Sequence, residues 1–261
     1  MAKQKQNDMV KAEDQTIVIP EWMKDEVIEG VETVAEFQTT PRIAIVQAMS
    51  QPERKELVGE GGVAIMPDGV AVAKKDEEFV VIPLVFWPTW EVHSDINDTA
   101  SPFVMESTSD ANSQIARLSK GRDTRNESYG EGFSKKYLEC LNFVVRIESG
   151  PATGELGTLT FSGGEHYTGS KLCGLLKRRS CSIYANRIAL STAMRQRNNK
   201  SWWGFDIANP EDGAVVSDKE TYDTLAEIHK GLARMVDTSK LLVSRDEKVA
   251  GAQGSLDTLP I

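Results

Sequence analysis

One run of this sequence, Phe79–His93, consists mostly of β-branched and aromatic residues and reads FVVIPLVFWPTWEVH. Side chains of these types pack well on the pleated surface of a sheet, so the run predicts a long β-strand. Pro83 and Pro88 lie inside it, and because proline cannot donate a ladder hydrogen bond they indicate an edge position or bulges. The run is far shorter than the roughly 20 apolar residues of a membrane-spanning helix. We therefore expect a β-sheet and no membrane-spanning segment.

Other segments share the strand pattern and are separated by turn-forming residues. They lie at 41–49, 136–148, 157–161, 183–194 and 201–208. The turn SGPATGE joins 136–148 to 157–161 as a hairpin, and RQRNNK joins the last two segments as another.

Apolar residues at helical spacing predict helices at 166–179 and 222–236. The Gly-bearing stretch 55–69 and the long polar stretch 94–134 are expected to be connections without regular structure, and a stretch as long as the second is usually either a functional loop or disordered.

This order is close to that of an OB-fold, about five strands with one helix between the third and the fourth. We therefore expect a mostly β protein with minor α content: an OB-fold-like, partly open barrel with a connecting helix, a C-terminal helix and flexible termini. The expected boundaries are a disordered arm at 1–19, an OB-like nucleic-acid-binding domain at 20–208 that carries the loop 94–134, a helical segment at 209–243 and a flexible tail at 244–261.

The first residues, MAKQKQNDMV, are polar where a signal peptide would have an apolar segment. The cysteines are Cys140, Cys173 and Cys181, an odd number with no CxxC pair, which argues against a disulfide framework and against a cysteine-rich zinc site. Both observations favour a cytoplasmic location.

Charge is segregated along the 261 residues, whose net charge is -9. Residues 115–200 hold 15 Lys/Arg and 7 Asp/Glu, a charge of +8, whereas 1–114 carry -12 and 201–261 carry -5. A basic block between acidic ends is expected if the middle binds phosphates. The alternative is that these charges only solvate separate faces, which the folded structure decides.

The basic block includes a hairpin in which Arg187, Arg195, Arg197 and Lys200 lead into the pair Trp202–Trp203. Adjacent side chains on a strand point to opposite faces, so one indole can enter the core while the other stacks on a base, an interaction of roughly 1–3 kcal/mol. The alternative is that both indoles belong to the core.

A second group of cations lies in the 94–134 loop and on the 166–179 helix, where Tyr167, with Tyr184 further along the chain, is a further stacking candidate. Such a lining would bind phosphates in a strongly salt-dependent way. The predicted nucleic-acid-binding residues are Arg122, Arg125, Lys135, Lys136, Lys171, Lys177, Arg178, Arg179, Arg187, Arg195, Arg197, Lys200, Trp202 and Trp203.

Gly164–Lys171, GEHYTGSK, nearly reproduces the phosphate-binding motif G-x-x-x-x-G-K-[ST]. In that motif lysine directly follows the second glycine, whereas in this chain Ser170 intervenes and Leu172 takes the position of the hydroxyl residue. We interpret the segment as a decoy and expect no enzyme and no catalytic residue. His166 with Cys173 and Cys181 matches no zinc pattern, so neither a metal nor a cofactor is expected.

Over Pro41–Ala208, the order of PRIAIVQ, VVIPLVFWPTW, LNFVVRI, GTLTFSG, the short basic helix and RIALSTAMRQRNNKSWWGF resembles phage-encoded single-stranded-DNA-binding proteins of the OB-fold type. The ending LDTLPI is similar to the tip of bacterial single-stranded-DNA-binding proteins, although it has one acid, Asp257, where they have several, and Ile261 in place of Phe. Some phage relatives carry a zinc-binding insertion in the central loop, but residues 94–134 contain no cysteine or histidine, so zinc is not carried over.

The resemblance implies sequence-tolerant binding of single-stranded DNA that protects replication or recombination intermediates in the host cytoplasm. It also implies that Leu259, Pro260 and Ile261 could recruit replication or recombination proteins. The alternatives are a phage structural or regulatory protein that binds another protein and, third, a nucleotide-hydrolysing enzyme. The sequence leaves the oligomeric state open, a homo-oligomer included.

Overall fold

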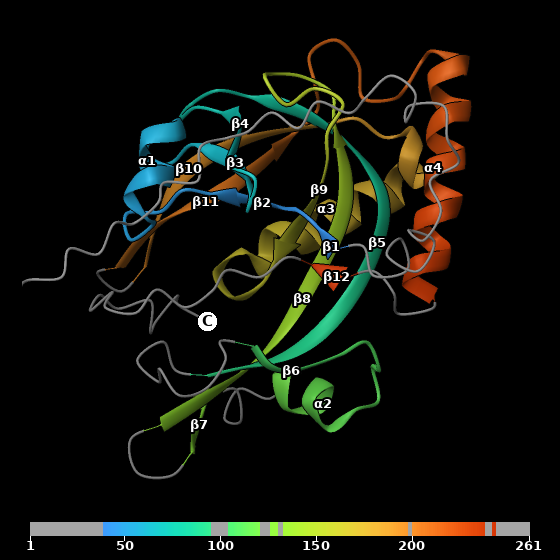
Figure 1. The fold of residues 1–261 in the computed structure, drawn as a ribbon. Helices are drawn as coiled ribbons and strands as arrows, with labels where there is room; N and C mark the ends of the chain where they lie inside the picture. The colour runs from blue at the N-terminus through green and yellow to red at the C-terminus, as the bar shows by residue number, and fades with distance from the viewer. Residues whose placement is uncertain are drawn as a thin grey trace, which may run out of the picture. The chain divides into compact units, whose positions relative to one another are not determined.

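The computed structural model describes residues 39–94, 104–120, 126–129, 133–197, 200–237 and 242–243. Contacts divide the chain into residues 1–36 and 37–261, and all of the described residues belong to the second unit. This unit is mostly β, as predicted, and its main sheet curls into a half-barrel (Figure 1). The predicted arm at 1–19 and tail at 244–261 lie outside the described residues, and the other domain boundaries stay predictions.

Strands predominate over helices in the described part of the chain. The strands are β1 (Thr39–Thr40), β2 (Arg42–Ile45), β3 (Val63–Met66), β4 (Val70–Ala73), β5 (Phe79–His93), β6 (Val104–Thr108), β7 (Asn126–Tyr129), β8 (Phe133–Ile147), β9 (Leu156–Phe161), β10 (Ile188–Arg197), β11 (Lys200–Ala208) and β12 (Leu242–Val243). The helices are α1 (Pro52–Val58), α2 (Gln114–Lys120), α3 (His166–Arg179) and α4 (Lys219–Asp237), with short 3-10 turns η3 (Gly163–Glu165) and η4 (Ile183–Ala185).

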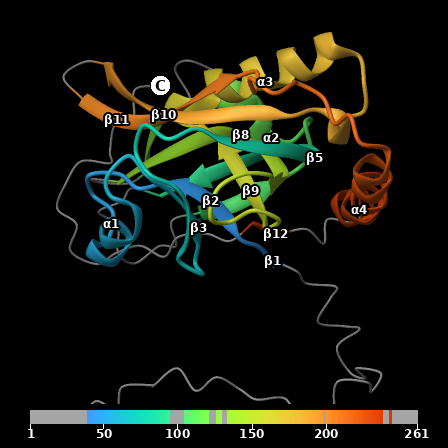
Figure 2. The same ribbon diagram turned by 90° about the horizontal axis from the view of Figure 1, so that it is seen from above.

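Ten of the described strands form one sheet whose main path runs β11-β10-β5-β8-β9-β2-β3-β4. Neighbours on this path are antiparallel except β2 and β9, which are parallel. Seen from above, the sheet curls from β10 and β11 round to β2 and β3 (Figure 2). A separate parallel pair joins β1 to β12.

The strand predicted at Phe79–His93 is β5, and its prolines are accommodated by both of the expected devices. A bulge interrupts the β5–β8 pairing between Pro83 and Val85. On its other side β5 pairs with β10 only over Phe79–Val81 and with β6 only from Trp90 onward. Pro83 and Pro88 lie between these two pairings. On that side of β5, none of the described strands pairs with the proline positions, so the missing N–H groups cost no ladder hydrogen bond there.

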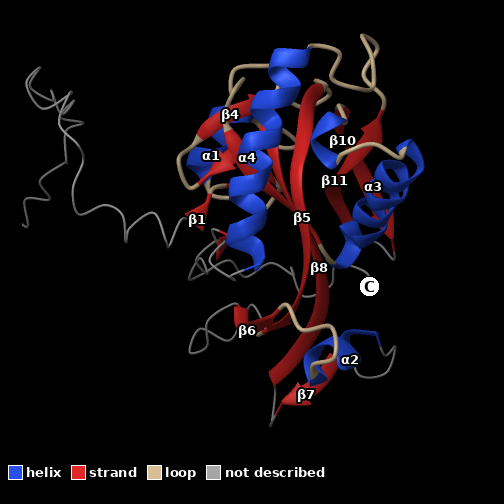
Figure 3. Cartoon of the chain, turned by 90° about the vertical axis from the view of Figure 1, so that its right-hand side faces the viewer, coloured by secondary structure: helices blue, strands red, loops and turns tan. Residues whose placement is uncertain are grey.

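The core lies inside the curl, where Phe79, Phe143, Phe161 and Leu190 are almost completely buried. Helix α3 connects β9 to β10 and adds Leu172 to this core. The opposite face of β5 and β8 carries Ile82, Leu84 and Val144, which pack against Leu225 and Leu232 of α4. Figure 3 shows α4 lying along the sheet beside β5, with α3 on the other side of the strands.

The expectation of unstructured connections at 55–69 and 94–134 is wrong. The first stretch contains the end of α1 and all of β3, and the second contains β6, α2 and β7. These elements are short, and their apolar residues are buried only by tertiary neighbours: Val58 packs with Ala64 and Met66, and Ile115 packs on Trp90 and Tyr137. Elements of this length leave too little periodicity to be recognised locally.

One edge of the half-barrel closes through a side chain. Gln47, which follows β2, donates from Nε2 to the carbonyl oxygen of Trp203 (2.8 Å) and accepts from its N–H at Oε1 (2.9 Å). The amide thus takes the place of a neighbouring strand for β11. Nearby, the Thr192 hydroxyl donates to the carbonyl oxygen of Gly61 (2.7 Å), which connects β10 to the residues just before β3.

Within the residues that the structure describes, none of the helices has both the length and the apolar surface needed to cross a membrane.

Candidate nucleic-acid interface

Helix α3 presents an aromatic and basic face to solvent. Its apolar face places Leu172 in the core, with Leu175 and Leu176 packed against it. Residues at spacings of three and four then share the opposite face. Tyr167, which is 80 % exposed, lies in line with Lys171, and Lys177 and Arg178 follow in the last turn. Gly174 lies between them, and a Cβ there would have no atom within 4 Å, so no other described element covers the helix at that position.

Two of the cations predicted to bind DNA also contact the exposed edge of β11. Lys171 Nζ donates to the carbonyl oxygen of Ile207 (3.3 Å), and Arg195 donates to the carbonyl oxygen of Phe205 (2.9 Å) and to Asp206 (2.7 Å). Unpaired edge groups invite pairing with another chain, and these side chains together with Gln47 occupy them.

The two adjacent indoles separate as strand geometry requires. Trp203 is 8 % exposed, packs against Gly61 and donates from Nε1 to Glu60 (3.1 Å). Trp202 is half-buried and lies against Gly164 at the start of α3. The available indole is therefore Trp202, next in space to the helix that carries Tyr167.

Glu165 joins β11 to the N-terminal end of α3. Its carboxylate accepts from Trp202 Nε1 (3.2 Å) and from the N–H of Phe205 (2.9 Å). Gly204 lies directly under it, since a Cβ there would approach Glu165 Oε1 to 2.2 Å. Only glycine leaves room for the carboxylate.

Gly204→Ala is expected to displace the Glu165 carboxylate and to lower the free energy of unfolding by about 1–3 kcal/mol, because the Phe205 N–H loses its acceptor. Tryptophan emission should change as well, since Trp202 loses its partner. Chemical denaturation followed by fluorescence measures both. Gly231→Ala is the matched control: its Cβ would meet nothing within 4 Å, and in the interior of α4 alanine should stabilise by about 0.5–1 kcal/mol. Equal effects of the two substitutions would contradict the assignment.

Two of the predicted arginines hold the chain together. Arg187 donates to Glu148 (2.6 Å) and forms a two-pronged contact with Asp212 (2.9 Å at each nitrogen). The hydrogen bond to Asp212 raises the pKa of Arg187, and the same bond lowers the pKa of the Asp212 carboxyl. Arg179 donates to four oxygens of the segments around η4 and β11, and burial lowers its guanidinium pKa. Neither guanidinium is available as a simple phosphate contact.

The remaining predicted residues divide into three groups. Lys136 lies on β8, in register with His93. Lys135, Arg197 and Lys200 lie on β8, β10 and β11, and their side chains lie outside the described structure. Arg122, Arg125, Leu259, Pro260 and Ile261 fall outside the described residues altogether.

The Gly164–Lys171 segment forms part of η3 and the first turns of α3 rather than an open phosphate loop. The ring of Trp202 lies over Gly164, the Glu165 carboxylate lies at the start of the helix, and the Lys171 ammonium contacts β11.

The residues that the structure brings together are thus Tyr167, Lys171, Lys177 and Arg178 on α3, with Trp202 beside its first turn; we call them the α3 face. The sequence did not indicate roles for Gln47 and Glu165. Their partners on β11 lie 156 and about 40 residues further along the chain, and no local sequence pattern predicts contacts over such distances. Comparison with known proteins finds no family model, no curated protein and no solved structure that matches this chain.

Proposed function

We propose that the protein binds single-stranded DNA without sequence preference, and that the α3 face is its contact surface. The observation that carries the proposal is the exposed ring of Tyr167 on the same helix face as Lys171 and Arg178, with Lys177 next to Arg178. Folding does not require a large aromatic side chain to be 80 % exposed, whereas a base can stack on such a ring. At 1.5 Å per residue, Tyr167 and Arg178 lie about 16 Å apart along the helix, enough to follow several phosphates.

The helix dipole gives a structural reason, independent of DNA, for cations at the C-terminal end of α3. Lys177 and Arg178 lie in the last turn of α3, where positive charge is favoured by the helix dipole. Stability alone therefore accounts for some basic residues there, but it does not account for Tyr167 at the other end of the same face. The combination of stacking ring and phosphate-binding charge favours nucleic acid over a purely structural role.

The curled sheet is compatible with an OB-fold, a partly open barrel that binds oligonucleotides in other proteins. A role in replication or recombination, a phage origin with location in the host cytoplasm, and recruitment of partners through Leu259, Pro260 and Ile261 belong to the same proposal.

The test is a fluorescence anisotropy titration of labelled oligo-dT at several salt concentrations. Replacing Lys177 and Arg178 together by alanine removes two phosphate contacts and should reduce the slope of log affinity against log salt by about 1.4. The matched control replaces Lys219 and Lys230 of α4, two exposed lysines in ion pairs with Asp223 and Glu227, and should leave the slope unchanged.

A single substitution tests the stacking ring. Tyr167→Ala should weaken oligo-dT binding about tenfold, and Tyr167→Phe should retain the affinity because the ring remains. Absence of any oligo-dT binding by the wild type at low salt refutes the proposal. Equal weakening by the α3 and α4 double variants refutes the assignment to the α3 face. A protein partner that co-purifies regardless of nuclease and salt supports the protein-binding alternative.

A further inference from the structure

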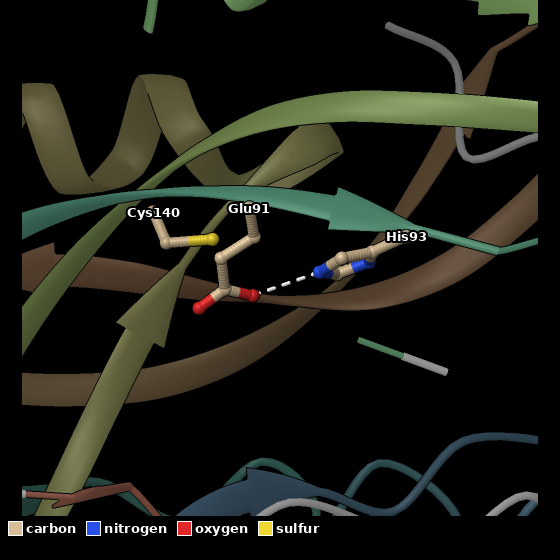
Figure 4. A group of neighbouring side chains, drawn as sticks. All are labelled: Glu91, His93 and Cys140. Atoms are coloured by element: carbon tan, nitrogen blue, oxygen red, sulfur yellow. Dashed lines mark hydrogen bonds and ion pairs between the residues drawn. The ribbon is translucent and has the colours of Figure 1, made fainter. Parts of the chain in front are cut away.

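A carboxylate, an imidazole and a thiol lie together where β5 and β8 pair, and none of the three residues belongs to the α3 face. Glu91 and His93 alternate along β5 and therefore share one side of the strand, and Cys140 on β8 is in register with Thr89 on the same side. Their exposed fractions are 0 %, 9 % and 1 %. The ligand atoms of the three all lie within 4.8 Å of one another. Figure 4 shows Cys140 on one side of Glu91 and His93 on the other.

A chain of partly buried hydrogen bonds leads to this cluster. The Thr160 hydroxyl donates to Asn142 Oδ1 (2.9 Å), Asn142 Nδ2 donates to the Thr89 hydroxyl (3.0 Å), and that hydroxyl donates to Glu91 Oε1 (3.3 Å). The other carboxylate oxygen, Oε2, lies 2.8 Å from His93 Nε2. Polar partners of this kind orient the side chains that bind metals and are a regular part of such sites.

We propose that Glu91, His93 and Cys140 bind a divalent transition metal ion, zinc by preference. The donor set of one sulfur, one nitrogen and one oxygen suits zinc, whereas magnesium and calcium prefer oxygen alone. Binding releases the Cys140 thiol proton to solvent and uses His93 as the neutral imidazole. The two charges of the ion then balance one carboxylate and one thiolate.

The geometry needs only small side-chain rotations. Zinc bond lengths of about 2.0–2.3 Å place tetrahedral donors roughly 3.3–3.8 Å apart. The Glu91–His93 distance of 2.8 Å is shorter than this range, and the 4.8 Å limit on the whole cluster is longer. An ion between the three groups would replace the hydrogen bond from Glu91 to His93. Three protein ligands leave a fourth position for water or another donor.

An ion at this position would link two neighbouring strands. His93 is the last residue of β5 and Cys140 lies within β8, so the metal would fasten the far end of the β5–β8 pair. The sequence predicted no metal because it has no CxxC pair and because His166, Cys173 and Cys181 match no zinc pattern. Cys140 lies 47 residues from His93, and only the antiparallel register brings the two together.

The experiment titrates chelator-treated full-length protein with Co²⁺, which occupies sites of this type and absorbs visibly when tetrahedral. We expect one ion per chain and a thiolate-to-cobalt charge-transfer band that Zn²⁺ abolishes. Cys140→Ala should lose the band and weaken binding about 100-fold or more, since loss of outer partners alone weakens sites 10–100-fold. Cys181→Ala, which removes an exposed cysteine, is the matched control and should keep the band.

A second readout avoids any dependence on how the variants fold. One equivalent of Zn²⁺ added to the metal-free wild type should raise Tm, and a chelator should reverse the change. The proposal is overturned if the wild type gives neither a thiolate band nor a rise in Tm. It is also overturned if the band persists in a folded Cys140→Ala variant. Oligo-dT binding by the α3 face is not required for either outcome.

Discussion

Phe161→Ala is expected to lower the free energy of unfolding by about 3–5 kcal/mol, the largest effect of a single substitution that we predict. The Phe161 side chain is fully buried, and its ring lies edge-on to Phe143 (5.9 Å between centroids) and to Phe205 (6.0 Å). It therefore connects β9 to β8 and β11 across the inside of the curl. Removing the ring leaves a cavity that the surrounding strands cannot close, because each is held by its sheet neighbours.

Urea unfolding measured by circular dichroism tests this expectation. Phe86→Ala is the control, because Phe86 also contacts Phe143 (4.8 Å) but is 36 % exposed. Its loss should destabilise much less, since part of the ring is already in water. A similar loss for the two variants would mean that the aromatic cluster is not the centre of the core.

Arg179→Lys is expected to destabilise the protein by about 2–3 kcal/mol although it conserves the charge. The guanidinium donates to the carbonyl oxygens of Arg187 (3.1 Å) and Ala214 (2.9 Å) and to the side chains of Asn186 (3.2 Å) and Asn209 (2.6 Å). A lysine ammonium lacks the planar fork that reaches several of these oxygens together, and acceptors left without a donor are costly.

The same variant separates a structural role from a phosphate contact. If Arg179 orders the end of α3, the folded lysine variant should bind oligo-dT as the wild type does while unfolding at lower denaturant concentration. Unchanged stability together with weakened oligo-dT binding would return Arg179 to the interface predicted from the sequence. Denaturant midpoints and anisotropy titrations on the same preparation give both quantities.

Local patterns were sufficient for the long elements. The run Phe79–His93 forms β5 with the predicted bounds, and the leucine spacing at 166–179 forms α3 with the predicted bounds. Both are long enough for their side-chain periodicity to be read from neighbouring residues alone. The segment 183–194 was predicted less well: it begins as η4, and the strand β10 starts at Ile188 and extends to Arg197.

The candidate interface was only partly predictable for a different reason. Composition identified a block of +8 at residues 115–200, but a count of charges contains no information about which cations have intramolecular partners. Arg179 and Arg187 lie in that block, as do Lys177 and Arg178, and only the folded chain distinguishes the first pair, held by acids and carbonyls, from the second, which faces solvent.

The sequence by itself determined the class of fold, the bounds of two long elements, β5 and α3, and the concentration of positive charge in the middle of the chain, because each is a property of residues near one another. Tertiary structure alone decided that Trp203 is buried while Trp202 is half-exposed, that Gln47 closes the edge of β11, and that Glu91 and His93 meet Cys140. These outcomes depend on strand register and on how far the sheet curls, which are set by packing between residues far apart in the chain.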